Sequence, residues 1–577
     1  MYSTRSLSVI SSIILVIFLI VSIYSGILSP PPLITYTTDE NFIGESGIFL
    51  LYGNTPRALE WAALPSIFIA YLLFLIWCGI VILKSISSIH GLPDVLTIID
   101  KNAFYYLNHR EEFVIWERWI QIFIVGLIVY KTIQFIIHSK HPILKSEIRI
   151  ILTLLCLCAD VIWITVPVIR PEALSGSLFL YIIVRILFTE KITLQIATTL
   201  LILFILTFTQ RLIFVFFSPF VIGSILFHLW EQKIAWKTYL KYFLIIILAL
   251  FALMPFIITD TMVVMKSFLG GVFIKINHNQ MDSYFNMDFI NNFLSQPINI
   301  FFSIFAIIGS WFLVKLYSSK FISILFIANF LFILFSSLKA AQLYITHTFP
   351  LSMMAIIMVG FGINSITQLV EENQKKWVLG ILALFLITNS FWAIHKSDIA
   401  IIQQQQNIAD AVSWIKGLEN NEKIALTLDF DGLILKNKAC LFREYEANAS
   451  DNYRIRKLSK LLKLPTSDSV SKFSLPILAQ SFAFEDEKLF DTQYQISLKY
   501  VDSDSTKRFD TEYFFENNNN MSHCILQEQA LKRFQTGNYK YIISKDQILN
   551  LTPVKSFTRG NGIMFWAYEF KSVTDKI

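Results

Sequence analysis

Eleven runs of about 20 mostly apolar residues occupy the first two thirds of this 577-residue chain. Because an α-helix needs about 20 such residues to cross the hydrocarbon core of a bilayer, each run is a candidate membrane span. Soluble, disordered and collagen-like folds are excluded, and the fold class is a polytopic α-helical membrane protein. The runs are residues 7–29, 115–137, 150–168, 172–188, 192–208, 211–229, 241–259, 297–316, 320–338, 350–369 and 377–395.

Charge divides the chain into two domains. Residues 396–577 hold 47 of the 90 Asp, Glu, Lys and Arg residues, about 26% of their positions, against about 11% in residues 1–395. We therefore expect a membrane domain over 1–395 and a water-soluble domain over 396–577. The net charge of +6 is small for this length and reports membrane topology, so we expect no nucleic-acid partner.

The soluble domain is predicted to be a small α/β domain. Residues 403–418 have the pattern of an amphipathic helix that leaves the membrane. The segments 423–429, 539–545 and 563–570 are short, β-branched or aromatic runs, which predict strands.

A twelfth apolar run, residues 62–84, decides the topology. If it lies along the outer interface and the N-terminus is cytoplasmic, twelve Lys and Arg residues beyond residue 130 face the cytoplasm and five face outside. Residues 30–114 then form one extracytoplasmic loop, and the soluble domain lies on the same side of an inner or plasma membrane. The cytoplasmic residues are Lys131, Lys140, Lys145, Arg149, Lys191, Lys233, Lys237, Lys241, Lys315, Lys320, Lys375 and Lys376. The outer residues are Arg170, Arg211, Lys266, Lys275 and Lys339.

The first outer loop opens with Pro30-Pro31-Pro32, which cannot continue the first helix. Thr38 or Asp39 can cap a following helix, and the acids Asp39 and Glu40 suit its positive end. The same carboxylates at a membrane face can also serve as a general base toward a hydroxyl group. The local pattern leaves both interpretations open.

The order of motifs in this loop is more specific. Asp39-Glu40 is followed by the turn Gly53-Asn54-Thr55-Pro56, by Trp61, and by Leu64-Pro65 before the apolar interfacial run. This order resembles the membrane glycosyltransferases of the GT-C superfamily, in particular the protein mannosyltransferase and aminoarabinose transferase relatives. The corner Arg170-Pro171-Glu172 and the segment 344–350, which ends at Pro350, are similar to later motifs of the same families.

The resemblance implies a GT-C-like fold and transfer of a sugar from a polyprenyl-phosphate donor to an extracytoplasmic acceptor. It implies Asp39 as the catalytic base, with inversion at the anomeric carbon. Glu40 is the second carboxylate, which either bonds the acceptor or fixes the loop. Trp61 and Glu172 are the expected substrate-binding residues, although Glu172 can also simply complement the dipole of its helix. The acceptor is left open among a glycolipid, a polysaccharide and a protein.

Stabilisation of the leaving phosphate requires cations on the outer side. Each candidate also has a structural interpretation as a cation that anchors the membrane interface, and His347 as a packed histidine. Asp160 lies near the middle of the third span, where a charge is costly and faces a cavity or a partner. The donor-phosphate candidates are Arg57, Arg170, Arg211, Lys339 and His347.

The outer segments contain no metal-binding motif, so we expect no cofactor; a divalent metal is compatible with this chemistry but is not required. Two other functions stay open. An O-antigen ligase or polymerase places its main functional loop late in the chain, whereas the richest loop here is the first. A lipid-linked glycan transporter predicts paired broken spans and inverted repeats, which the sequence does not indicate.

Overall fold

The computed structural model describes residues 4–28, 46–47, 50, 67–85, 97–98, 110–168, 171–233, 236–259, 261, 297–317, 319–338, 345–417 and five short segments beyond them. Those segments are 424–426, 441–442, 541–544, 552–560 and 565–569. The chain forms two compact units. The first comprises residues 1–26, 39–79 and 116–395, and the second comprises 27–38, 80–115 and 396–577.

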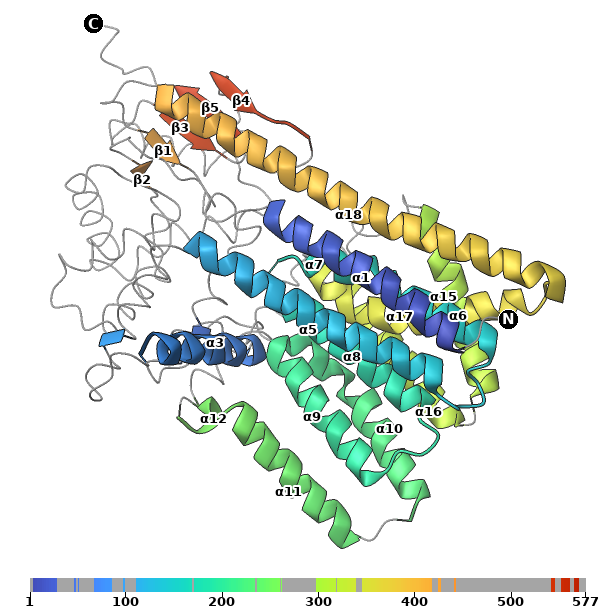
Figure 1. The fold of residues 1–577 in the computed structure, drawn as a ribbon. Coiled ribbons are helices and arrows are strands. Elements are labelled where there is room, and N and C mark those ends of the chain that lie inside the picture. The colour runs from blue at the N-terminus through green and yellow to red at the C-terminus, as the bar shows by residue number, and fades with distance from the viewer. Residues whose placement is uncertain are drawn as a thin grey trace, which may run out of the picture. The chain divides into compact units, whose positions relative to one another are not determined.

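The first unit is a bundle of apolar helices (Figure 1). Among the described residues, eight helices are long and apolar enough to cross a membrane, and shorter apolar helices occupy the other predicted spans. Each predicted span overlaps a described helix, so the prediction of a polytopic α-helical membrane protein is confirmed. The helices are α1 (Thr4–Leu28), α5 (Arg110–His138), α6 (Ser146–Leu157), α7 (Asp160–Thr165), α8 (Pro171–Phe188), α9 (Leu194–Gln210), the 3-10 helix η2 (Leu212–Phe217), α10 (Ser218–Glu231), α11 (Trp236–Leu253), α12 (Phe256–Thr259), α15 (Pro297–Leu316), α16 (Lys320–Leu338), α17 (Ile345–Thr367) and α18 (Glu372–Gly417).

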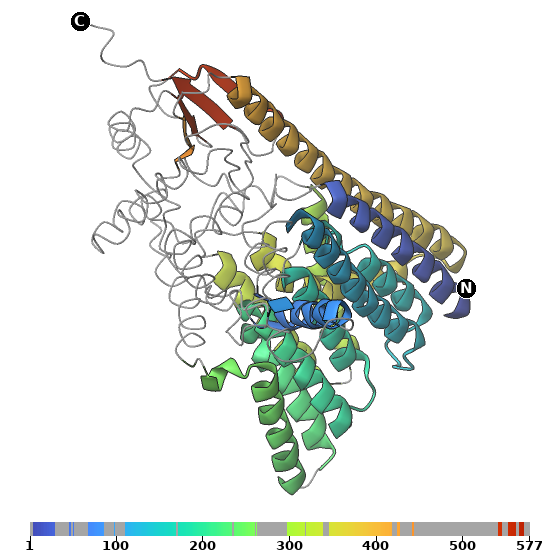
Figure 2. The same cartoon turned by 60° about the vertical axis from the view of Figure 1, so that its left-hand side comes forward.

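Helix α3 (Ile67–Ser85) is formed by the ambiguous twelfth run. It runs at an angle to α1 and α5 in both views (Figures 1 and 2). The backbone N–H of Ile69 donates to Gln210 Oε1 at the last residue of α9, at 3.4 Å. The first turn of α3 therefore lies at the end of the bundle where α9 ends and α8 begins.

The third span differs from its prediction as one continuous helix. It breaks at Cys158 and Ala159 into α6 and α7, and Asp160 is the first residue of α7. Backbone groups freed inside a membrane must find other partners. Trp163 Nε1 donates to the Leu157 carbonyl at 2.6 Å, and Ser390 Oγ of α18 donates to the Cys158 carbonyl at 2.9 Å. These side chains make the break sustainable in an apolar environment.

A stack of three aromatic rings joins α1, α7 and α18. Phe18 lies between Trp163, at 5.1 Å between ring centroids, and Phe391, at 4.9 Å. The interplanar angles are 9° and 7°, so the rings are stacked on both faces. Offset aromatic pairs add to the packing beyond the area that they bury. The stack therefore fixes the first and last helices of the bundle against the broken third span.

Helices α15 and α17 cross in close contact at two glycines. A Cβ at Gly309 would lie 1.7 Å from the Met358 carbonyl oxygen, and a Cβ at Gly362 would lie 2.0 Å from the Phe305 carbonyl oxygen. Such an approach is possible only where small residues let two backbones meet, which is a common device of membrane helices.

The second unit contains the last part of α18 and a five-stranded mixed sheet. Strands β1 (Ile424–Leu426), β2 (Leu441–Phe442), β3 (Tyr541–Ser544), β4 (Lys555–Phe557) and β5 (Phe565–Glu569) take the order β2-β1-β3-β5-β4. β1 pairs in parallel with β2 and β3, while β5 pairs antiparallel with β3 and β4. Three of these strands lie within the segments that the sequence predicts as strands; the extracytoplasmic location of the sheet stays a prediction.

Helix α18 is tied to this sheet by specific contacts. Asn407 Nδ2 donates to the Arg559 carbonyl at 3.1 Å, and the Arg559 N–H donates to Asn407 Oδ1 at 2.8 Å. Asp410 pairs with the Arg559 guanidinium at 2.8 Å. Trp414 packs against Tyr541 and Phe557 from β3 and β4. The end of the last helix and the sheet therefore form one body.

The glycine crossing gives a direct test of the packing. Gly309→Ala places a methyl group on the Met358 backbone, so α15 and α17 must separate and the free energy of unfolding should fall by about 1–3 kcal/mol. Gly380→Ala in α18 is the matched control, because nothing lies within 4 Å of the added methyl. Thermal unfolding of both variants in nanodiscs should show a lower Tm for Gly309→Ala alone. Equal Tm values would contradict the crossing.

Candidate functional site

Buried polar side chains gather at the end of the bundle where α8 begins and α9 ends. They come from three elements that the sequence places far apart: the first half of α5, the first turn of α8, and the α9–η2 junction. Charged or amide groups buried in a membrane protein are costly and mark functional sites. The residues are Glu117, Arg118, Gln121, Glu172, Gln210 and Arg211, each at most 7% exposed.

The central interaction is an ion pair between Glu172 and Arg211. Arg211 Nε lies 3.4 Å from Glu172 Oε1, and the two side chains are 9% and 2% exposed. Glu172 follows Pro171 in the first turn of α8, where an acid suits the helix dipole. Arg211 adopts an extended conformation (φ −144°, ψ 114°) that ends α9 and starts η2. The sharp change of direction at the α9–η2 junction is what brings the guanidinium to the start of α8.

Two buried polar atoms of Glu172 and Gln210 are still able to form hydrogen bonds. Glu172 Oε2 and Gln210 Nε2 are both buried and have no hydrogen-bond partner among the described residues. A buried polar atom without a partner costs about 1–3 kcal/mol, so native proteins supply one, from ordered water or from a ligand. The carboxylate of the pair and the residue before Arg211 therefore hold one unused acceptor and one unused donor among the described residues.

Helix α5 connects this region to α1 and α7. Arg118 Nη1 donates to the Gly26 carbonyl at 2.8 Å, near the end of α1. Gln121 Nε2 donates to the carbonyls of Val166 and Val168 at 3.1 and 2.7 Å, just after α7. These carbonyls belong to helix ends that lack intrahelical partners. The polar face of α5 therefore holds the helix ends that surround the site.

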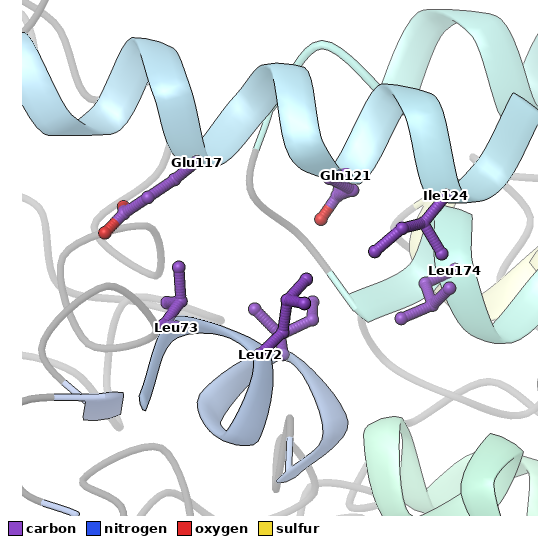
Figure 3. Close-up of a pocket in the computed structure, with 7 residues that line it drawn as sticks. Leu72, Leu73, Glu117, Gln121, Ile124 and Leu174 are labelled. Carbon is purple, nitrogen blue, oxygen red and sulfur yellow. The ribbon is translucent and has the colours of Figure 1, made fainter. Parts of the chain in front are cut away.

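A narrow pocket opens between α3, α5 and α8 (Figure 3). Figure 3 shows Glu117 and Gln121 projecting from one side of α5 toward Leu72 and Leu73 of α3. The pocket adjoins the residues of the ion pair at two places. Ile69 of α3 lines it and contacts Gln210, the residue before Arg211. Leu174 of α8 also lines it and lies two residues after Glu172. Its lining residues are Ile69, Leu72, Leu73, Glu117, Gln121, Ile124 and Leu174.

The residues predicted from the sequence fall into two groups. Glu172 and Arg211, predicted separately as a substrate ligand and a phosphate ligand, are in contact. His347 lies in the first turn of α17, and its side chain is outside the described part of the chain. The other predicted site residues lie outside the described residues, and their roles stay predictions: Asp39, Glu40, Arg57, Trp61, Arg170 and Lys339.

Two further sequence features have a structural explanation. In the segment 344–350, Phe349 is fully buried and packs on Gly176 of α8, where a Cβ would lie 2.3 Å from the ring. Asp160 Oδ1 accepts from the Val161 N–H at 2.8 Å at the start of α7. Among the described residues, no group of three His, Cys, Asp or Glu side chains is placed to bind a metal ion.

Sequence reasoning missed the polar face of α5. A usable signal was present, because Glu117 and Gln121 are four residues apart and therefore share one helix face inside an otherwise apolar run. Gln210 was passed over because only its neighbour Arg211 carries a charge. Amides buried in a span deserve the same weight as charges, since both need a partner in lipid.

Comparison with known proteins gives one similarity. The structure aligns with the crystal structure of ArnT from Cupriavidus metallidurans bound to undecaprenyl phosphate, covering 96% of this chain and 97% of that chain. The sequence identity is 9% and the TM-score is 0.44. An alignment at this level assigns neither a family nor an activity by itself. No protein-family model and no curated protein sequence matches the chain.

The ion pair makes a testable prediction about stability. Glu172→Gln and Arg211→Gln each remove one side of a buried ion pair, so each should lower the free energy of unfolding by about 3–5 kcal/mol. The double variant removes both charges and should cost less than the sum of the two, because residues in contact are not additive. Thermal or denaturant unfolding in nanodiscs measures the coupling.

The pair Glu372–Lys375, at 2.7 Å and with a Glu372 side chain that is 76% exposed, is the control for this cycle. Glu372→Gln should leave the unfolding transition unchanged, since exposed ion pairs contribute little. Strict additivity of the Glu172 and Arg211 variants would show that the two side chains do not interact in the folded protein.

Proposed function

We propose that this protein is an integral-membrane glycosyltransferase that moves a sugar from a polyprenyl-phosphate donor to a hydroxyl group of an extracytoplasmic acceptor. The observation that carries the proposal is the buried Glu172–Arg211 pair beside the apolar helix α3. A guanidinium held at the end of a membrane bundle fits a substrate that is an anion and a lipid at once. The order of motifs in residues 30–114 supports the same class.

The location of this pair supports the orientation of the reaction. It lies where α8 begins and α9 ends, whereas Lys191 precedes α9 at its other end and Lys233 follows α10. Because positively charged connections stay in the cytoplasm, the site belongs to the extracytoplasmic side in this proposal. The sugar then enters from the outer leaflet, with its phosphate at the interface and its lipid tail in the bilayer.

Arg211 has the chemistry to bind the donor phosphate. Its planar fork of N–H groups matches phosphate oxygens, and Glu172 holds the fork in place through Nε. As the bond between the anomeric carbon and the phosphate oxygen breaks, negative charge grows on the phosphate. A preorganised guanidinium stabilises that charge more in the transition state than in the bound substrate, which is what accelerates the reaction.

Asp39 completes the reaction as the base. The acceptor oxygen attacks the anomeric carbon from the face opposite the phosphate, its proton passes to the Asp39 carboxylate, and the polyprenyl phosphate leaves with the electron pair of the broken bond. The configuration at the anomeric carbon is therefore inverted. No step in this sequence needs a metal ion or a redox cofactor, and Glu40 orients the acceptor or the loop.

A lipid-linked glycan transporter is the second candidate, and one observation favours it. The third span is broken at Cys158 and Ala159, and broken helices line the substrate sites of many transporters. Transport without chemistry would leave the lipid phosphate attached to its sugar. Release of free polyprenyl phosphate therefore separates the two functions.

The catalytic role of Asp39 can be tested with the full-length protein in nanodiscs. The donors are polyprenyl phosphates that carry glucose, galactose, mannose, arabinose or N-acetylglucosamine, and envelope extracts supply the acceptor. Asp39→Asn should lower kcat by about 10²–10⁴-fold, because the amide cannot take the proton, while donor binding is retained. Glu40→Gln is the matched control and should keep more activity. Normal product formation by Asp39→Asn would remove this residue from the mechanism.

A further inference from the structure

The pocket between α3, α5 and α8 is apolar except for two groups. Its walls are formed by leucine and isoleucine side chains, and the exceptions are Glu117 and Gln121 on one face of α5. Both side chains are at least nine-tenths buried. The region around Arg211 therefore has a neighbouring recess with a polar side and an apolar side.

The amide of Gln121 has a fixed orientation. Its nitrogen faces two backbone carbonyls, those of Val166 and Val168, and carbonyl oxygens accept hydrogen bonds but cannot donate them. The oxygen must therefore point the other way. Gln121 Oε1 is buried, has no hydrogen-bond partner among the described residues, and points toward the α3 side of the pocket in Figure 3.

The chemistry of the missing partner follows from these groups. Gln121 Oε1 and the Glu117 carboxylate are both acceptors, and the described residues that line the pocket include no basic side chain. Acceptor groups at one site select a hydrogen-bond donor. The narrow shape and the leucine wall exclude a bulky charged group and fit a single hydroxyl on a sugar ring.

We infer that this pocket binds one hydroxyl group of the glycan substrate, through Gln121 Oε1 and the Glu117 carboxylate. The inference rests on the proposed function and adds a specificity site to it. Ile69 lines the pocket, and its N–H bonds Gln210, the neighbour of Arg211, so the hydroxyl belongs to a molecule held beside the donor phosphate. The hydroxyl comes either from the donor sugar or from the acceptor.

The experiment pairs deoxygenated substrates with pocket variants in the full-length protein in nanodiscs. The best donor of the panel above, and the acceptor it serves, are each prepared with single hydroxyls replaced by hydrogen. In the wild type, loss of the bound hydroxyl should lower kcat/KM about 5- to 100-fold, because the buried Gln121 Oε1 then loses its partner. In Glu117→Gln the same deoxygenation should cost at most a few-fold.

A second variant tests the pocket without touching its polar groups. Leu72→Phe narrows the pocket from the α3 side. In this variant, removal of the substrate hydroxyl should therefore no longer lower kcat/KM. Leu75→Phe is the matched control on the same helix, because Leu75 is 63% exposed and does not line the pocket; it should keep the wild-type penalty. If the pocket variants lose their sensitivity to deoxygenation of the donor, the bound hydroxyl belongs to the donor sugar. If they lose their sensitivity to deoxygenation of the acceptor, it belongs to the acceptor.

The possible failures are distinct. If the wild type transfers sugar but every deoxy penalty is the same in Glu117→Gln and Leu72→Phe as in the wild type, the pocket binds no substrate hydroxyl and this inference is wrong. If the wild type transfers no sugar from any donor of the panel, the proposed function is contradicted, and the hydroxyl site falls with it.

Discussion

The packing of the membrane unit depends on one requirement: every buried polar group must form its hydrogen bonds within the protein, because the bilayer core holds no water. In the apolar interior of a bilayer, a backbone carbonyl or a charged side chain must find its partner within the protein. The broken third span meets this condition through Trp163 and Ser390, and the ends of α1 and α7 meet it through Arg118 and Gln121. The Trp163 bond is local, but the bonds of Ser390, Arg118 and Gln121 join segments distant in sequence, so they also fix how the helices are arranged.

The same condition explains why the Glu172–Arg211 pair indicates function. A buried ion pair contributes little to stability compared with apolar residues of the same volume, because both charges lose their hydration. Two polar atoms, Glu172 Oε2 of the pair and Gln210 Nε2 of the residue before Arg211, have no hydrogen-bond partner among the described residues and add to that cost. The proposed recognition of an anionic lipid would use this pair, because such recognition requires a preorganised cation.

Much of the helical architecture could be predicted from the sequence. The length of the apolar runs predicts the spans, and short β-branched or aromatic runs such as 539–545 predict strands. The break between α6 and α7 could not be predicted, because no proline or glycine marks Cys158 or Ala159 and the partner of the Cys158 carbonyl, Ser390, is distant in sequence. For the site, Arg211 and Glu172 were found individually from their charges. Their contact depends on the turn at the α9–η2 junction, which composition does not encode.

The polar face of α5 shows the limit of reasoning by residue type. Glu117 and Gln121 lie within an apolar run, and only the packing of α3 and α8 shows that they line a pocket. The predicted roles of Asp39 and Glu40 depend on the order of motifs in the first loop, outside the described residues. The two sources of information are therefore complementary: the loop supplies the proposed base, and the helical bundle supplies the proposed phosphate and hydroxyl ligands.

Electron cryo-microscopy of the full-length protein in nanodiscs with a bound polyprenyl phosphate tests the central claim most directly. The account predicts phosphate density within hydrogen-bonding distance of the Arg211 guanidinium, with the lipid tail leaving toward the bilayer, and loss of that density in Arg211→Gln. Phosphate density at the opposite, lysine-rich end of the bundle, or density that persists unchanged in Arg211→Gln, would contradict it.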